Sequence, residues 1–116
     1  MAEVLVDTDV FVDHLRGAAR LWTGRDRLAY SVITRAELFA GDAEQESAVA
    51  AILAPFRELP VDRAVAEDAG RMRRRSGVRL PDALIAATAL QAGIPLLTRN
   101  RRDFERIPRL RLRTPR

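Results

Sequence analysis

The residues best suited to chemistry in this chain are carboxylates. Three of them lie near predicted strand ends or helix starts, and a fourth lies within a predicted helix: Asp7, Asp82, Asp103 and Glu37. In open α/β sheets, ligands bind in the crevice beyond the carboxyl ends of the strands. These acids can therefore face one crevice, although each comes from a different part of the chain.

Carboxylates that lie close together repel one another and retain protons unless a cation lies among them. The chain has no Cys and a single His, His14, which we expect to be structural. An all-oxygen ligand set favours Mg²⁺ or Mn²⁺ over Zn²⁺. The sequence therefore indicates a site for a hard divalent cation.

Each acid, taken alone, has a simpler explanation. Asp82 can favour a helix N-terminus through the helix dipole, which contributes about 0.3–1 kcal/mol. Asp7 and Asp103 can cap helices, and Glu37 can pair with an arginine. Capping gives no reason for Glu37, which lies in the middle of the helical stretch 33–39. The simple explanations therefore account for the four acids together less well than for each acid alone.

Four segments resemble the acidic blocks of PIN-domain ribonucleases, most closely the VapC toxins of type II toxin–antitoxin modules. They occur in the family's order within residues 4–107, and they are residues 6–10 (VDTDV), 31–38 (SVITRAEL), 81–89 (PDALIAATA) and 97–104 (LTRNRRDF). The resemblance implies an α/β fold with three layers, α/β/α, around a central, mostly parallel sheet of four or five strands. It implies that Asp7, Glu37, Asp82 and Asp103 bind Mg²⁺ or Mn²⁺.

The resemblance also implies a function. It predicts cleavage of structured RNA such as tRNA or rRNA, inhibition by a VapB-type antitoxin, and a homodimer. Where the family usually has Asn this chain has Asp9, so a fifth carboxylate can contact the metal, and the number of ions stays open. Thr8, Thr98 and Asn100 occupy polar positions of the blocks and are expected to position the acids.

Length and composition limit the classes of protein to which this chain can belong. With 116 residues, 47% hydrophobic and 31% charged, residues 1–116 are expected to form one folded domain. No apolar run approaches the roughly 20 residues of a membrane helix, so no membrane association is expected. We find no export signal, and the absence of Cys fits the cytoplasm.

The chain is basic entirely through arginine, with 20 Arg, no Lys and 16 acids. If five acids belong to the site, the remaining eleven leave the rest of the surface at about +9, which attracts polyanions such as RNA. Aromatic residues are only 5% of the chain, which favours recognition of RNA shape and backbone over base stacking. The candidate contacts are Arg73, Arg74, Arg75, Arg79, Arg99, Arg101 and Arg102.

Apolar periodicity alternates between strands and helices, which predicts βαβ units and a parallel sheet. The predicted strands are residues 4–6, 28–30, 58–61, 94–98 and 110–113. The predicted helices are residues 10–15, 31–41, 43–55, 63–76, 81–93 and 103–107, with one further turn at 18–22. Ser31 and Asp62 suit N-caps, and Gly77 suits a helix end.

Two other functions stay open at this point. Asp7-Thr8-Asp9 after a strand also resembles the nucleophile motif of haloacid dehalogenase-type phosphatases, but such sites normally use a lysine, which this chain lacks. A non-catalytic RNA-binding protein of the same fold is the other alternative. Trp22, Phe39 and Phe56 are expected in the core or at an interface, and Phe39 with the apolar face of residues 43–56 can form a groove for an antitoxin helix.

Overall fold

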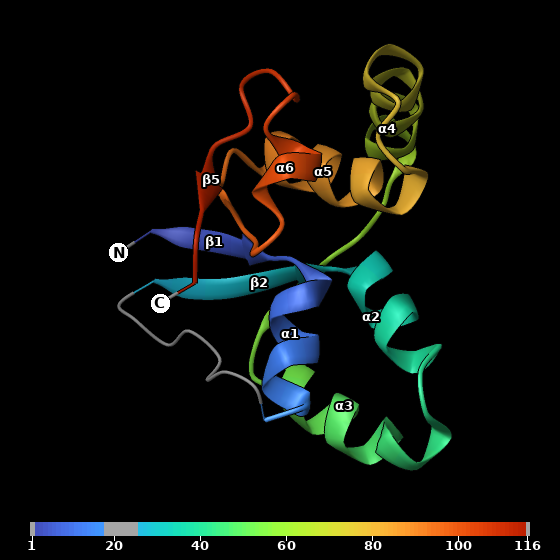
Figure 1. Ribbon diagram of the computed structural model, residues 1–116, viewed down its shortest axis with the longest axis vertical. Coiled ribbons are helices and arrows are strands. Elements are labelled where there is room, and N and C mark those ends of the chain that lie inside the picture. Colours follow the sequence, from blue (N-terminus) through green and yellow to red (C-terminus); the bar gives the residue numbers. More distant parts are fainter. Residues whose placement is uncertain (1, 18–25, 116) are drawn as a thin grey trace.

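Five parallel strands form the sheet at the centre of the computed structural model, which describes residues 2–17 and 26–115 (Figure 1). The strand order is β3-β2-β1-β4-β5, and all four pairings are parallel. This confirms the predicted parallel sheet. The strands are β1 (Glu3–Val6), β2 (Arg27–Ser31), β3 (Arg57–Leu59), β4 (Leu96–Leu97) and β5 (Leu112–Arg113).

Helices connect the strands in the predicted alternation. They are α1 (Thr8–Leu15), α2 (Val32–Phe39), a 3₁₀ turn η1 (Ala43–Gln45), α3 (Glu46–Leu53), α4 (Arg63–Ser76), α5 (Leu80–Ala92) and α6 (Arg101–Phe104). The predicted turn at residues 18–22, with Trp22, lies outside the described residues. None of the described helices combines the length and the apolar character that crossing a membrane requires.

Local capping fixes several of these boundaries. The Ser31 hydroxyl accepts a hydrogen bond from the Ile33 N–H at 3.0 Å and begins α2. Asp62 accepts from the Val65 N–H at 2.9 Å and begins α4, which ends at Gly77 with a left-handed φ of 73°. Such caps satisfy backbone groups that a helix leaves unpaired at its ends, so these predicted boundaries are confirmed.

Other boundaries differ from the prediction. The helix predicted at residues 103–107 is α6, which begins at Arg101 and ends at Phe104. Residues 105–107 turn instead, because the buried Ile107 enters the core while its N–H bonds the Phe104 carbonyl at 3.0 Å. The helix predicted at 43–55 starts with a 3₁₀ turn, and the third, fourth and fifth strands are each shorter than predicted.

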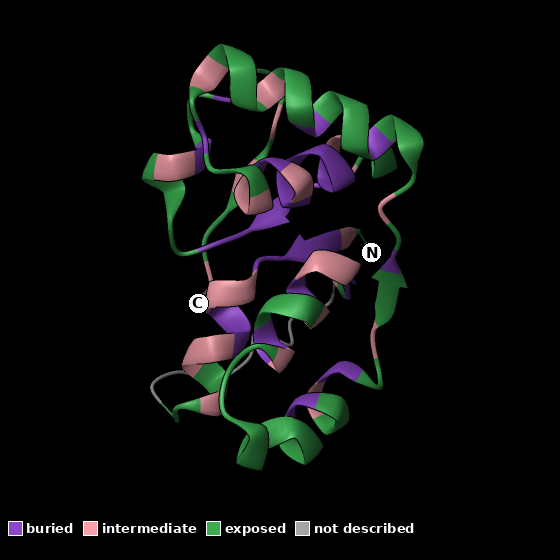
Figure 2. Cartoon of the chain, turned by 90° about the vertical axis from the view of Figure 1, so that its right-hand side faces the viewer, coloured by how far each residue is buried: buried purple, intermediate pink, exposed green. Residues whose placement is uncertain are grey.

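The sheet separates two apolar cores, which confirms the three-layer arrangement. Alternate strand side chains point to opposite faces: Leu5 and Leu96 pack with α4, α5 and α6, whereas Val4 and Val6 pack with α1, α2 and α3. Figure 1 shows these two groups of helices on opposite sides of the sheet. Figure 2 shows buried residues along the central strands and α5, and exposed residues along the outer side of α4.

Candidate active site

Asp7 follows β1, the strand on either side of which the two halves of the sheet are built. β1 pairs with β2 on one side and with β4 on the other, so the connections leave its carboxyl end in opposite directions. In parallel sheets this switch point opens a crevice for ligands. The Asp7 N–H donates to the Leu97 carbonyl at 2.9 Å, which places Thr98, the next residue, beside the Asp7 side chain.

The Asp7 carboxylate is almost completely buried. One oxygen, Oδ1, accepts from the Thr8 N–H at 2.8 Å, and Oδ2 accepts from the Thr98 hydroxyl at 2.8 Å. Burial, followed by repulsion from Asp9, raises the pKa of Asp7 from 3.8 to about 7 despite these two hydrogen bonds. A cation placed next to this group would offset both causes of the shift.

Asp9 lies beside Asp7 and carries an unsatisfied oxygen. Its Oδ2 accepts from the Arg99 N–H at 3.3 Å, but Oδ1 is buried and has no hydrogen-bond partner among the described residues. Burial raises the pKa of Asp9 as well. A buried carboxylate oxygen without a donor costs free energy and is well suited to binding a cation. The residue that departs from the family pattern therefore lies inside the site.

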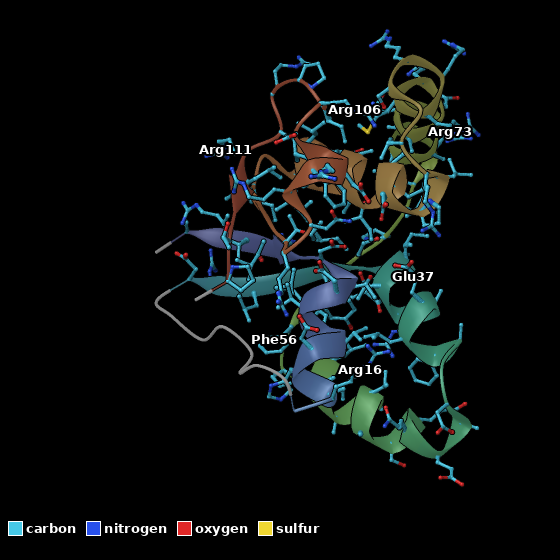
Figure 3. The ribbon with its side chains drawn as sticks, in the orientation of Figure 1. Arg16, Glu37, Phe56, Arg73, Arg106 and Arg111 are labelled. Atoms are coloured by element: carbon cyan, nitrogen blue, oxygen red, sulfur yellow. The ribbon has the colours of Figure 1, made fainter. Side chains whose placement is uncertain are left out.

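Glu37 reaches the same region from α2. Its Oε1 accepts from the Thr8 hydroxyl at 2.6 Å, and the Thr8 oxygen lies 2.9 Å from the hydroxyl oxygen of Thr34. Because the single Thr8 hydroxyl proton is directed to Glu37, the fully buried Thr34 donates to Thr8. Figure 3 labels Glu37 on α2, the helix that follows β2 directly.

Asp82 and Asp103 approach from the other side of the sheet. Asp82 is half-buried in the first turn of α5. Burial is the largest cause that raises the pKa of Asp82, and the negative charges of Glu37, Asp103 and Asp9 raise it further. The positive charge of Arg79 lowers this pKa. Asp103 accepts from the Asn100 side chain at 2.6 Å, and the Asn100 N–H donates to the Thr98 hydroxyl at 3.0 Å. The five acids therefore lie near enough for their charges to act on one another beyond the carboxyl end of β1.

The donor set suits a hard divalent cation. All candidate ligands are carboxylate oxygens, and one of these oxygens is orphaned. Burial, together with the charge of neighbouring carboxylates, raises the pKa of three of the acids, Asp7, Asp9 and Asp82. Within residues 2–17 and 26–115, no three acids or histidines surround a common point closely enough to bind an ion as they stand. Sharing one ion therefore requires rotation of side chains such as the exposed Glu37.

Sequence reasoning missed two residues beside the site. Thr34 orders the Thr8 hydroxyl, and Asp13 pairs with Arg99 and adds negative charge near Asp9. Thr34 precedes Glu37 by three residues, a spacing that places both on one face of a helix. A hydroxyl residue three positions before Glu37 was the signal available in the sequence.

The seven candidate RNA-binding arginines fall into two groups. Arg73 donates to the carbonyls of Gly77 and Val78 at 2.7 and 3.2 Å, and thereby closes the end of α4. Arg99 pairs with Asp13, and Arg101 donates to the Thr114 hydroxyl at 3.3 Å. The other four make no hydrogen bond or ion pair to another described residue, and they are Arg74, Arg75, Arg79 and Arg102.

The sequence and the fold of this chain have counterparts among known proteins. The family description "PIN domain" matches residues 4–110, nearly the whole chain. This chain belongs to the PIN-domain family. A curated relative of this PIN domain, Ribonuclease VapC10 of Mycobacterium tuberculosis, is 43% identical over 110 residues, which cover 84% of this chain and 82% of the relative.

Solved structures show the same architecture. A chain of DNA-bound VapBC from Salmonella typhimurium has a TM-score of 0.76 and 28% identity, with 98% of each chain covered. A chain of VapBC2 from Rickettsia felis, bound to a DNA fragment from its promoter, has a TM-score of 0.80 at 23% identity, with 97% of this chain and 98% of that chain covered. The family predicted from the four acidic blocks is therefore confirmed for this PIN domain.

Proposed function

We propose that this PIN domain is an endoribonuclease dependent on Mg²⁺ or Mn²⁺, and the toxin of a toxin–antitoxin pair. The observation that carries the proposal is the buried Asp7 beside Thr98 and the half-buried Asp9, which has an orphaned oxygen, with three more acids nearby. The relative named Ribonuclease VapC10 supports the reaction class. The VapBC complex of Salmonella typhimurium supports the biological context.

Each acid has a role in this proposal. Asp7, Asp82 and Asp103 hold the cation, Glu37 contributes directly or through water, and Asp9 offers its orphaned oxygen. A bound divalent ion lowers the pKa of a water and offsets charge on the phosphoryl oxygens of a phosphodiester. Thr98 and Thr8 position Asp7 and Glu37, respectively, through hydrogen bonds from their hydroxyl groups.

The substrate we propose is a structured RNA such as tRNA or rRNA. Arginines contact backbone phosphates through their forked guanidinium groups, which require no base sequence. Arg74, Arg75, Arg79 and Arg102 are available for such contacts, because none makes a hydrogen bond or ion pair to another described residue. The positive charge of Arg79 lowers the pKa of Asp82, so Arg79 is near enough to the acids to contact a phosphate bound beside them.

The partners we propose are a VapB-type antitoxin and a second copy of this chain, acting in the cytoplasm. Phe39 and Phe56 are half-buried at the border of the core beneath α1, α2 and α3. An antitoxin helix could pack its apolar face against this region, which lies next to Glu37 on α2. Binding there would obstruct the crevice that holds the acids.

The proposal is tested by incubating total tRNA and rRNA with the purified parent chain and with Asp7→Asn. We expect cleavage with Mn²⁺ or Mg²⁺, none in EDTA, and at least about a hundredfold loss in the variant, since one ligand and its charge are removed. Products should carry a 5′-phosphate, which distinguishes this reaction from contaminating metal-independent ribonucleases. Cleavage by Asp7→Asn at the parent rate would refute the assignment.

The same preparation separates the other two functions. Hydrolysis of a generic phosphomonoester, such as p-nitrophenyl phosphate, without RNA cleavage would identify a phosphatase. RNA binding without cleavage under any metal condition would identify a non-catalytic module. A melting transition equal to or higher than that of the parent shows that an inactive Asp7→Asn variant is still folded.

A further inference from the structure

A second hollow lies between α4, α5 and the loop that follows α6. Its volume is about 1130 Å³, and none of the five acids of the candidate active site lines it. The apolar part of its lining, which we call the floor, includes Met72, Leu90, Ile94, Ile107 and Pro108, and the polar Ser76 and Gln91 also line the hollow. We call this hollow the α4–α5 groove.

The rim of the α4–α5 groove is strongly positive. Five arginines line it, from α4 and from the 106–111 loop: Arg71, Arg75, Arg106, Arg109 and Arg111. The acid in the lining is Asp68, which Arg71 already neutralises at 2.8 Å. Figure 3 shows Arg106 where the loop after α6 faces α4.

Three of these arginines are available to a ligand. Arg111 donates to the Gly93 carbonyl at 2.9 Å, whereas Arg75, Arg106 and Arg109 make no hydrogen bond or ion pair to another described residue. Clustered guanidinium groups without acids repel one another, so an anionic ligand would relieve that repulsion.

The backbone at Arg109 is also unusual. Its φ of 67° lies in the left-handed region, and among the described residues it is the one non-glycine residue with a positive φ. Such a conformation is unfavourable for an L-residue with a long side chain, and glycine would adopt it readily. A strained residue that lines a hollow is a reason to suspect a function there.

The lining distinguishes between two kinds of anionic ligand. It contains no aromatic side chain, so unpaired nucleobases would find no stacking platform. An RNA duplex would place phosphates on the rim but would leave the apolar floor uncovered. A helix with leucines on one face and carboxylates at its edges matches both parts, and Met72 can adapt to such side chains.

We propose that the α4–α5 groove binds an acidic amphipathic helical segment of a partner protein. The groove reaches Gly93, which lies about 16 Å along α5 from Asp82, given a rise of 1.5 Å per residue. A segment bound at that end would leave the crevice of acids open. The proposal is independent of the ribonuclease assignment, because it uses none of the five acids.

The experiment uses three fluorescent probes with the full chain. The first is a peptide of about 15 residues with leucines at helical spacing and glutamates elsewhere, and the second replaces each leucine with serine at the same charge. The third is a short RNA duplex, since Arg75 is also expected to contact RNA. We expect the leucine peptide to bind roughly tenfold or more tightly than the serine peptide, measured by fluorescence anisotropy.

Neighbouring arginines on α4 provide a matched pair of variants. Arg75→Glu alters the groove rim and should weaken binding of the leucine peptide roughly threefold to tenfold, whereas Arg74→Glu, outside the lining, should change it less than about twofold. Arg109→Gly should weaken binding without lowering the melting temperature, because glycine accommodates the positive φ.

Three results would overturn the proposal. They are equal binding of the leucine and serine peptides, equal loss with Arg74→Glu and Arg75→Glu, and a dependence on Arg75 and Arg109 shown by the RNA duplex but not by the peptide. The last result would make the groove a nucleic-acid site. Cleavage of RNA by the parent chain, measured in parallel, reports on the ribonuclease assignment separately.

Discussion

At the scale of single residues, the chemistry depends on a carboxylate that the folded protein holds under unfavourable conditions. Asp7 is 5% exposed and lies beside Asp9, so its negative charge is destabilised. The Thr98 hydroxyl and the Thr8 N–H fix both of its oxygens. If the proposed cation binds here, the free energy of folding that Asp7 costs is the counterpart of its affinity for that cation.

We predict that Asp7→Asn stabilises the protein in EDTA. The folded pKa of about 7 exceeds the unfolded value near 3.8, so the folded state binds more protons between these values and parent stability falls as pH rises. The gain from Asn should therefore grow from pH 4 to pH 7 and then level off, reaching roughly 1–4 kcal/mol. Urea unfolding at pH 5 and pH 8 measures it.

The control for this prediction is Asp42→Asn. Asp42 is exposed and accepts from the Glu44 N–H at 3.0 Å, and asparagine caps a helix start about as well as aspartate. Little change is expected there at either pH. An Asp7→Asn variant less stable than the parent at pH 8 would show that the buried charge is not the dominant cost.

At the scale of elements, α2 carries both Glu37 and Thr34 into the site, so its starting point matters. The buried Ser31 ends β2 and caps α2 through the Ile33 N–H at 3.0 Å. Arg35 donates to Glu58 and to the Tyr30 hydroxyl, at 2.5 and 2.8 Å, and ties the same helix to β3 and β2. These contacts fix α2 relative to β2 and β3, and they therefore set the orientation of Glu37.

We predict that Ser31→Ala destabilises the protein by about 1 kcal/mol and lowers RNA cleavage, because the first turn of α2 loses its cap. The matched change is Ser47→Ala in α3, where the exposed serine makes no hydrogen bond to another described residue and alanine is the better helix former. Chemical denaturation and the cleavage assay provide the two readouts. Equal effects of the two substitutions would contradict a specific role for the cap.

At the scale of the whole molecule, the site exists only when both sides of the sheet are in place. Asp7 and Asp9 follow β1, Glu37 comes from the side of α1, α2 and α3, and Asp82 and Asp103 come from the side of α5 and α6. An ion bound among them would join elements that are far apart in the sequence. Binding to the folded state alone then stabilises the entire fold.

We predict that Mn²⁺ or Mg²⁺ raises the melting temperature of the parent in a saturable manner. At a hundredfold excess over Kd the gain is about 2.7 kcal/mol, which corresponds to several degrees for a domain of this size. Asp7→Asn should need at least about tenfold more metal for the same shift. Thermal unfolding after EDTA dialysis and metal titration measures both, and identical titrations would exclude Asp7 as a ligand.

The sequence by itself determined the local structure and the candidate acids. The caps at Ser31 and Asp62, the end of α4 at Gly77 and the buried α5 follow from side chains that act within a few residues of their own position. Such short-range hydrogen bonds and apolar periodicity can be recognised in a linear sequence. Where contacts with residues distant in the sequence set the ends of an element, as at α6 and β4, the predicted boundaries differ from the observed ones.

Only the tertiary structure decided how the acids meet. The orphaned oxygen of Asp9 and the burial that raises the pKa of Asp7 arise because β1 pairs with β4, about ninety residues away in the chain. The sequence marks Asp9 as a departure from the family pattern but gives no sign of its unsatisfied oxygen. Desolvation and strand order are properties of the assembled sheet, since they depend on which distant segments exclude water from a side chain.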